Sequence, residues 1–237
     1  MQKSLFLGFI NRYYLGGNTD SAKLVVENNS LSTKFISSDQ NVIGEVVLNE
    51  FQAPNAELGV YATSQLIKML SAVDENMEIS FGDVDSKIYS MNFKDTDTNI
   101  TYMLADLSVI RQVPNLKSLP DFDVKIELNK EFANNFKKAA NALPESDNFG
   151  VTSDGTETKI IINHSSVNTN RIVFKAVPKE ATAMDTVCFS AKLFKEILNA
   201  NADATGVLEV SSKGLAKVTF STKEYSSTYY LVKLTIA

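Results

Sequence analysis

Apolar residues at helical spacing mark the segment 130–143. Phe132, Phe136, Ala139 and Leu143 fall at i, i+4, i+7 and i+11, which places them on one face of a helix. The opposite side of this helix carries lysines and asparagines. The pattern therefore predicts an amphipathic helix with an apolar inner face and a basic outer face.

The same spacing predicts three more helices, in residues 3–14, 64–73 and 190–199. Ser64 and Ser190 stand at the start of the last two segments. We expect both to be N-caps, because a serine hydroxyl accepts a hydrogen bond from an otherwise unpaired backbone N–H.

Most of the remaining sequence alternates between apolar and polar residues, as half-buried strands do. Segments 158–164, 170–176, 217–223 and 228–236 are rich in β-branched and aromatic residues, and glycine-containing turns separate several of them. The expected fold class is α+β: mostly strands, with a few short helices.

The pattern occurs twice along the chain. Shifting the sequence by 126 residues aligns residues 6–48 with the second half without a gap, and an offset of 127 then aligns Leu66 with Leu193. Two similar domains are therefore predicted, at 1–107 and 124–237. The segment between them, 108–123, holds two of the five prolines and is expected to be an extended connector.

Positive charge is concentrated in the four predicted helices. Eight basic and two acidic residues give these segments +6, and because the chain as a whole carries −5, the remainder carries −11. A lysine on a helix is most often an ordinary solvated residue, but basic residues at repeat-equivalent positions suggest a shared role, and Arg12 aligns with Lys138. Arg12 is expected to point outward. The basic residues are Lys3, Arg12, Lys68, Lys130, Lys137, Lys138, Lys192 and Lys195.

Other chemistry finds little support in the sequence. The pairs Asp83/Asp85 and Asp95/Asp97 could hold a metal or act as acid and base, but both are more typical of hairpin turns. His164 fits a turn, and Cys188 lies in an apolar stretch where it should be buried and inert.

No nucleotide-binding or nucleophile-elbow motif occurs, so we expect no cofactor, no metal site and no enzymatic activity. No run of about 18 apolar residues is present. The lone cysteine fits a reducing compartment, and a cytoplasmic protein is expected.

Two stretches resemble the DNA polymerase sliding clamps, most closely those of T-even-like bacteriophages. They are 57–104, with a strand, a short helix, an acidic turn and a strand pair, and 186–236, which is similar to the same element of a second domain. The resemblance implies a non-enzymatic processivity factor whose six domains close a helix-lined ring around duplex DNA. With two domains per chain, it implies a homotrimer.

The resemblance also implies the partners and sites of such a ring. The eight basic residues would contact phosphates without reading sequence, and Val113, Leu116 and Ile236 would line a pocket for partner peptides. The partners would be double-stranded DNA, a DNA polymerase and a clamp-loader ATPase, with no membrane. The location would be the cytoplasm of an infected bacterial host.

Two other interpretations stay open from the sequence. A β-rich virion structural or interaction protein would account for the acidic surface and the lack of catalytic motifs, although not for basic helices at matched positions. A hydrolase that uses one of the Asp pairs is a more distant alternative.

Overall fold

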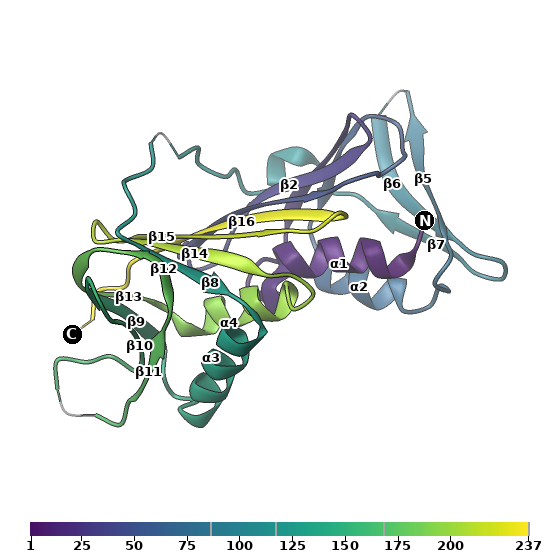
Figure 1. Cartoon of the computed structure of the whole chain (residues 1–237). Coiled ribbons are helices and arrows are strands. Elements are labelled where there is room, and N and C mark those ends of the chain that lie inside the picture. The colour runs from purple at the N-terminus through teal and green to yellow at the C-terminus, as the bar shows by residue number, and fades with distance from the viewer. Residues whose placement is uncertain (86, 117, 168, 237) are drawn as a thin grey trace. The chain divides into compact units, whose positions relative to one another are not determined.

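The chain folds into two units, each with its own pair of helices (Figure 1). The computed structural model describes residues 1–85, 87–116, 118–167 and 169–236. Unit 1 comprises Met1–Ser38, Gly44–Pro114 and Thr222–Ser227. Unit 2 comprises Asp39–Ile43, Asn115–Ser221 and Thr228–Ala237.

Unit 1 combines two helices that contact each other, α1 (Lys3–Tyr14) and α2 (Thr63–Leu70), with two sets of neighbouring strands. The strand order is β3-β2-β1-β4 in one set, and the other set is the three-stranded sheet β5-β6-β7. Its strands and short 3-10 helices are η1 (Leu15–Gly17), β1 (Ala22–Glu27), β2 (Ser30–Ile36), β3 (Val42–Leu48), β4 (Ala56–Val60), β5 (Glu78–Val84), β6 (Lys87–Lys94), β7 (Asn99–Met103) and η2 (Leu107–Val109).

The core of unit 1 lies between α1 and the inner faces of these sheets. Phe6 and Tyr13 of α1 are buried and pack against Phe93 of β6 and Phe35 of β2, with ring centroids 5.6 Å and 6.4 Å apart. Burial of α1 thus follows the apolar positions that predict the helix, because residues at i, i+3, i+4 and i+7 share one face.

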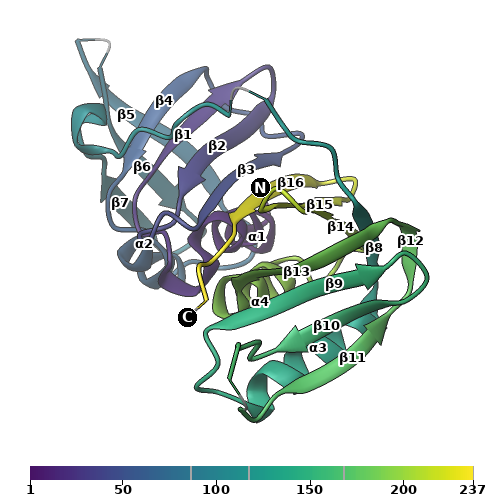
Figure 2. The ribbon, with the colours of Figure 1, turned by 90° about the vertical axis from the view of Figure 1, so that its left-hand side faces the viewer.

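Unit 2 has the same ingredients, with helices α3 (Lys130–Ala142) and α4 (Ala191–Ala200). Figure 2 shows both helices lying side by side behind the sheet β11-β10-β9-β13. A second set of neighbouring strands has the order β12-β8-β14-β15-β16. The strands are β8 (Val124–Leu128), β9 (Asn148–Asp154), β10 (Thr158–Ile162), β11 (Ile172–Ala176), β12 (Pro178–Ala181), β13 (Ala183–Ser190), β14 (Gly206–Ser211), β15 (Leu215–Ser221) and β16 (Tyr225–Val232), the last of which begins within unit 1.

The order of elements repeats between the units, as the sequence predicts. An offset of 126 places β1 on β9, and the strand order β3-β2-β1-β4 corresponds to β11-β10-β9-β13. An offset of 127 places the strands that follow α2 on those that follow α4. The mostly-β fold with a few short helices is therefore confirmed. Between β7 and β8, residues 110–116 and 118–123 form neither helix nor strand.

One of the two predicted serine caps is present. The Ser190 hydroxyl accepts a hydrogen bond from the Leu193 N–H at 3.3 Å, so Ser190 is the N-cap of α4. The prediction for Ser64 is wrong, since α2 begins at Thr63 and the Ser64 N–H donates instead to Asp20 Oδ1 at 2.9 Å. A carboxylate from elsewhere in the fold has replaced the local cap.

Candidate nucleic-acid interface

A cluster of phenylalanines fixes the orientation of α3 and α4. Phe136 and Phe194 are buried with ring centroids 4.8 Å apart, and both contact Phe149 of β9. Because the apolar face of each helix is anchored in this cluster, the opposite face points to solvent. That outer face carries five lysines.

The five helix lysines of unit 2 are distributed over the outer sides of both α3 and α4. Lys130, Lys138 and Lys192 are exposed, while Lys137 and Lys195 are half-buried. The Lys195 ammonium of α4 donates a hydrogen bond to Asn141 Oδ1 of α3 at 3.4 Å. This bond joins the polar faces of the two helices, so their lysines belong to one surface. Asn141 was not predicted to take part, because nothing in the sequence indicates a contact between residues 54 positions apart.

The helices of unit 1 carry fewer accessible cations. Lys68 is exposed on α2, but the Lys3 ammonium donates to the Val73 carbonyl. The Glu75 carboxylate accepts hydrogen bonds from the Ser4 hydroxyl and the Ser4 N–H, and these bonds lower the pKa of Glu75. A negative charge therefore lies at the start of α1, close to Lys3.

The prediction that Arg12 points outward is wrong. Arg12 is only 3% exposed, its guanidinium lies 3.9 Å from the centre of the Tyr225 ring, and one of its N–H groups donates to the Gly8 carbonyl at 2.9 Å. This is the geometry of a cation–π contact, in which a flat guanidinium stacks on an aromatic face. Arg12 therefore cannot reach a phosphate, and it leaves the set of proposed DNA contacts.

A glycine inside α1 makes room for this arrangement. A Cβ at Gly8 would lie 2.4 Å from Tyr225 Oη, which donates a hydrogen bond to the Leu5 carbonyl at 2.9 Å. Glycine in the middle of a helix costs about 1 kcal/mol, so its presence calls for a structural reason. Gly8 is thus the one signal in the sequence that something packs closely against this side of α1.

Replacing Gly8 with alanine is expected to lower the free energy of unfolding by about 1–3 kcal/mol, despite the better helix propensity of alanine. The added methyl group would displace the Tyr225 hydroxyl and break its bond to Leu5. Denaturant unfolding measures the change, and Tyr225→Phe is the matched background. In the Tyr225→Phe protein, which lacks the hydroxyl, Gly8→Ala should lower the free energy of unfolding by less than it does in the wild type. Equal decreases in the two proteins would contradict the explanation.

Comparison with known proteins identifies the fold. No family model and no curated protein matches the sequence. Among solved structures, PCNA of A. fulgidus bound to the C-terminal region of FEN-1 superposes with a TM-score of 0.79 and 15% sequence identity, over 100% of this chain and 98% of that one. PCNA of Entamoeba histolytica gives a TM-score of 0.75 and 16% identity, over 99% and 97% of the two chains. The chain has the PCNA-like clamp fold.

The residues expected to form a peptide pocket in this clamp fold do not share one cavity. Val113 lines a small cavity of about 170 Å³ in unit 1, beside Phe35 and Arg111. Ile236 lines a cavity of about 480 Å³ in unit 2, with Leu234 and Cys188. Leu116 lies in the connector and is 43% exposed. A role of these three residues in partner binding stays a prediction.

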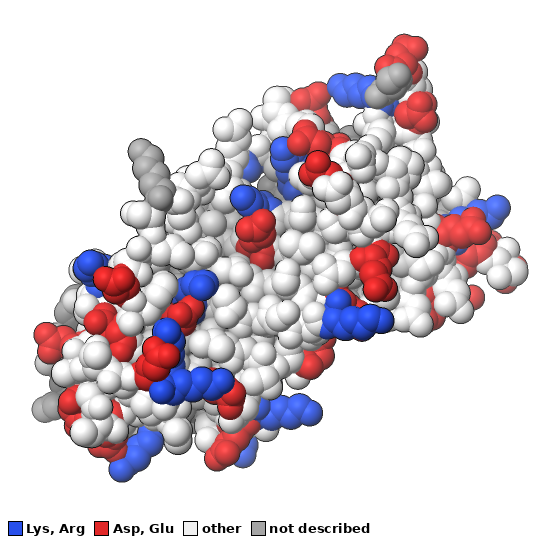
Figure 3. Space-filling model, turned by 45° about the horizontal axis from the view of Figure 1, so that its top comes forward, with Lys and Arg blue, Asp and Glu red and all other residues white. Residues whose placement is uncertain are grey.

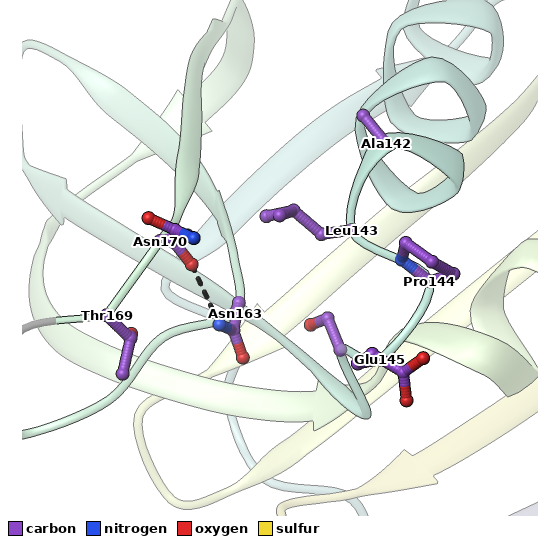
Figure 4. A pocket seen from close by; sticks show the side chains of 8 residues that line it. Ala142, Leu143, Pro144, Glu145, Asn163, Thr169 and Asn170 are labelled. Atoms are coloured by element: carbon purple, nitrogen blue, oxygen red, sulfur yellow. Dashed lines mark hydrogen bonds between the residues drawn. The ribbon is translucent and has the colours of Figure 1, made fainter.

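One cavity of the clamp fold offers little acid–base chemistry. Its volume is about 730 Å³, and it lies between the end of α3 and the residues Asn163, Thr169 and Asn170 (Figure 4). Among its described lining residues Glu145 alone has an ionisable side chain, and the Asn163 amide is tied to the Asn170 carbonyl at 2.8 Å. The described lining of this cavity therefore offers no second ionisable side chain to pair with Glu145 as acid and base.

The Asp95/Asp97 pair lies in the hairpin turn between β6 and β7, as predicted, whereas Asp83 lies within β5 and Asp85 in the turn that follows it. Asp95 accepts hydrogen bonds from the N–H groups of Asp74, Asp97 and Thr98, and these bonds lower its pKa. The described residues contain no group of three or more His, Cys, Asp or Glu arranged to hold a metal ion.

Cys188 is a buried thiol, in agreement with the sequence. Burial raises the pKa of Cys188 to about 11, so the thiolate needed for nucleophilic attack is scarce at neutral pH. His164 lines the same cavity and follows the turn residue Asn163. The helices of the described residues are too short or too polar to cross a membrane.

Strand surfaces of the clamp fold carry charges of both signs. Figure 3 shows basic and acidic side chains interspersed on the face it presents. In unit 2, Lys125 pairs with Glu180 at 2.8 Å and Lys179 with Glu127 at 2.7 Å. These strand lysines are therefore neutralised locally, whereas none of the ion pairs among the described residues involves a lysine of α3 or α4.

Proposed function

We propose that this protein is a sliding clamp, a non-enzymatic processivity factor that encircles duplex DNA and tethers a DNA polymerase. The observation that carries the proposal is a lysine-bearing helix pair on a PCNA-like clamp fold. A ring that moves along DNA must bind phosphates rather than base edges, because base contacts carry sequence information and would hold it at particular sites. Lysine suits this role as a flexible, hydrated point charge.

Salt-sensitive attraction between lysines and phosphates would centre the duplex, and the closed ring would retain it. In this proposal Lys3, Lys68, Lys130, Lys137, Lys138, Lys192 and Lys195 face DNA. The two domains are residues 1–107 and 124–237, with 108–123 as the connector. Six such domains make a ring of three chains.

The sheet edges suggest how chains join. Strand β7 ends one sheet of unit 1 and β11 ends one sheet of unit 2. Both carry exposed apolar side chains: Met103 on β7 is 62% exposed, and Val173 on β11 is 48% exposed. An exposed apolar edge strand is prone to pair with another chain, so ring closure would place β7 of one copy against β11 of the next.

The partners follow from this role. A clamp-loader ATPase would open the ring, since the chain has no nucleotide-binding motif of its own, and a polymerase would dock through Val113, Leu116 and Ile236. No cofactor or metal is required. A bacteriophage origin and a cytoplasmic location in the infected host are part of the same proposal.

The test of the proposed function begins with absolute mass. Three chains of 26.1 kDa give about 78 kDa, and light scattering across a concentration series should find this species. Met103→Lys at the β7 edge is expected to shift the mass toward the monomer, whereas Leu119→Lys in the connector should leave it unchanged. A strict monomer at every concentration would contradict the ring.

DNA topology then separates a clamp from the alternative, a β-rich virion structural or interaction protein. After loading, a clamp should stay on circular DNA and slide off linear DNA. Equal retention on both would favour the structural protein, which has no reason to distinguish them.

A further inference from the structure

The two helix pairs carry equal formal charge but expose it unequally. The residues of α1 and α2 sum to +3, as do those of α3 and α4. In unit 1, however, Arg12 is buried against Tyr225 and the Lys3 ammonium is bound to the Val73 carbonyl. Lys68 is the one basic residue of that pair that is exposed.

A carboxylate weakens the basic character of unit 1 further. Glu75 is held at the start of α1 by two hydrogen bonds from Ser4, next to Lys3 in the chain. Both bonds favour the ionised form. A phosphate approaching this end of α1 would therefore meet a fixed negative charge.

In unit 2, the exposed faces of the two helices share one positively charged patch. Asn141 lies three residues after Lys138 on the same exposed face of α3, and its side chain contacts the Lys195 ammonium of α4. Lys138 and Lys195 therefore belong to one patch, Lys138 from α3 and Lys195 from α4. Among the ion pairs of the described residues, none joins either lysine to a carboxylate.

We infer that phosphate contact is concentrated at the patch formed by Lys138, Asn141 and Lys195, and that the helices of unit 1 act mainly as a weakly charged spacer. This inference rests on the proposed function and refines it. A ring of three chains would then hold DNA at three cationic patches, rather than by six equivalent domains. Asn141 is the positioning residue that keeps Lys195 turned toward α3.

The salt dependence of duplex binding tests this inference. Each lysine that neutralises a phosphate adds about 0.9 to the slope of log K against log salt concentration. Binding of a fluorescent duplex of about 30 base pairs is measured by anisotropy from about 50 to 200 mM salt, at protein concentrations up to about 1 mM. The double variant Lys138→Gln/Lys195→Gln should lower the slope by about 0.9 for each of the two lysines it removes from phosphate contact. The double variant Lys3→Gln/Lys68→Gln should lower the slope by less than half of that amount.

The possible outcomes distinguish a failure of this inference from a failure of the proposed clamp function. Equal reductions of the slope in the two double variants would overturn the unequal contribution of the units while leaving a DNA-binding clamp in place. A wild-type protein that binds no duplex under these conditions would overturn both. Asn141→Ala should weaken binding, and only in chains that retain Lys195; an effect of equal size in the Lys195→Gln background would overturn its positioning role.

Discussion

Replacing Phe194 with alanine is expected to lower the free energy of unfolding of unit 2 by about 3–5 kcal/mol. The side chain is fully buried, and its ring packs against Phe136 and Phe149 at centroid distances of 4.8 Å and against Phe132 at 6.4 Å. Alanine would leave a cavity in a cluster whose members come from two helices and a strand, and these elements cannot close around it without moving the lysine-bearing helices.

Denaturant unfolding of the alanine and leucine variants measures this destabilisation. Phe194→Leu is the matched control, because it keeps an apolar group in the space and should cost less than half as much. A decrease below about 1 kcal/mol for Phe194→Ala would mean that the cluster does not determine where α3 and α4 sit. Far-UV circular dichroism of the folded variants shows whether the helices themselves persist.

The sequence predicts the fold well because the fold depends on local patterns. The spacing of Phe132, Phe136 and Ala139 defines the buried face of α3, and the structure buries all three. The repeat adds a second, independent constraint, because the two halves must satisfy the same pattern of elements. The Ser64 cap fails for the opposite reason: its replacement, Asp20, lies 44 residues away and leaves no local trace.

The candidate site is harder to predict, because charge does not show accessibility. Arg12 and Lys138 align in the repeat, and both lie on the polar side of a predicted helix. In the structure one stacks on Tyr225 and the other is exposed. The difference comes from the hairpin tip at 222–227, which lies at the opposite end of the sequence from Arg12. Gly8 hints at that close approach, but it does not say which residue approaches.

Reversing the charge of Lys137 and Lys138 together to glutamate is expected to reduce loader-dependent processive DNA synthesis on the order of tenfold or more. Each chain would lose two cations and gain two anions on the outer face of α3, so the surface proposed to attract phosphates would repel them. Neither side chain belongs to the phenylalanine cluster, and the fold should survive. Primer extension on a circular template, with loader and polymerase present, measures the effect as shorter products.

Lys34→Glu with Lys94→Glu is the control for total charge. It changes the net charge of the chain from −5 to −9, as the first pair does, but its residues lie on the strands β2 and β6. If the helix lysines act by facing DNA, this variant should retain most of the synthesis. If both variants lose it equally, net charge rather than position is responsible. If the Lys137/Lys138 variant synthesises as wild type, α3 does not line the channel, because a channel wall with reversed charge cannot be neutral toward a polyanion passing through it.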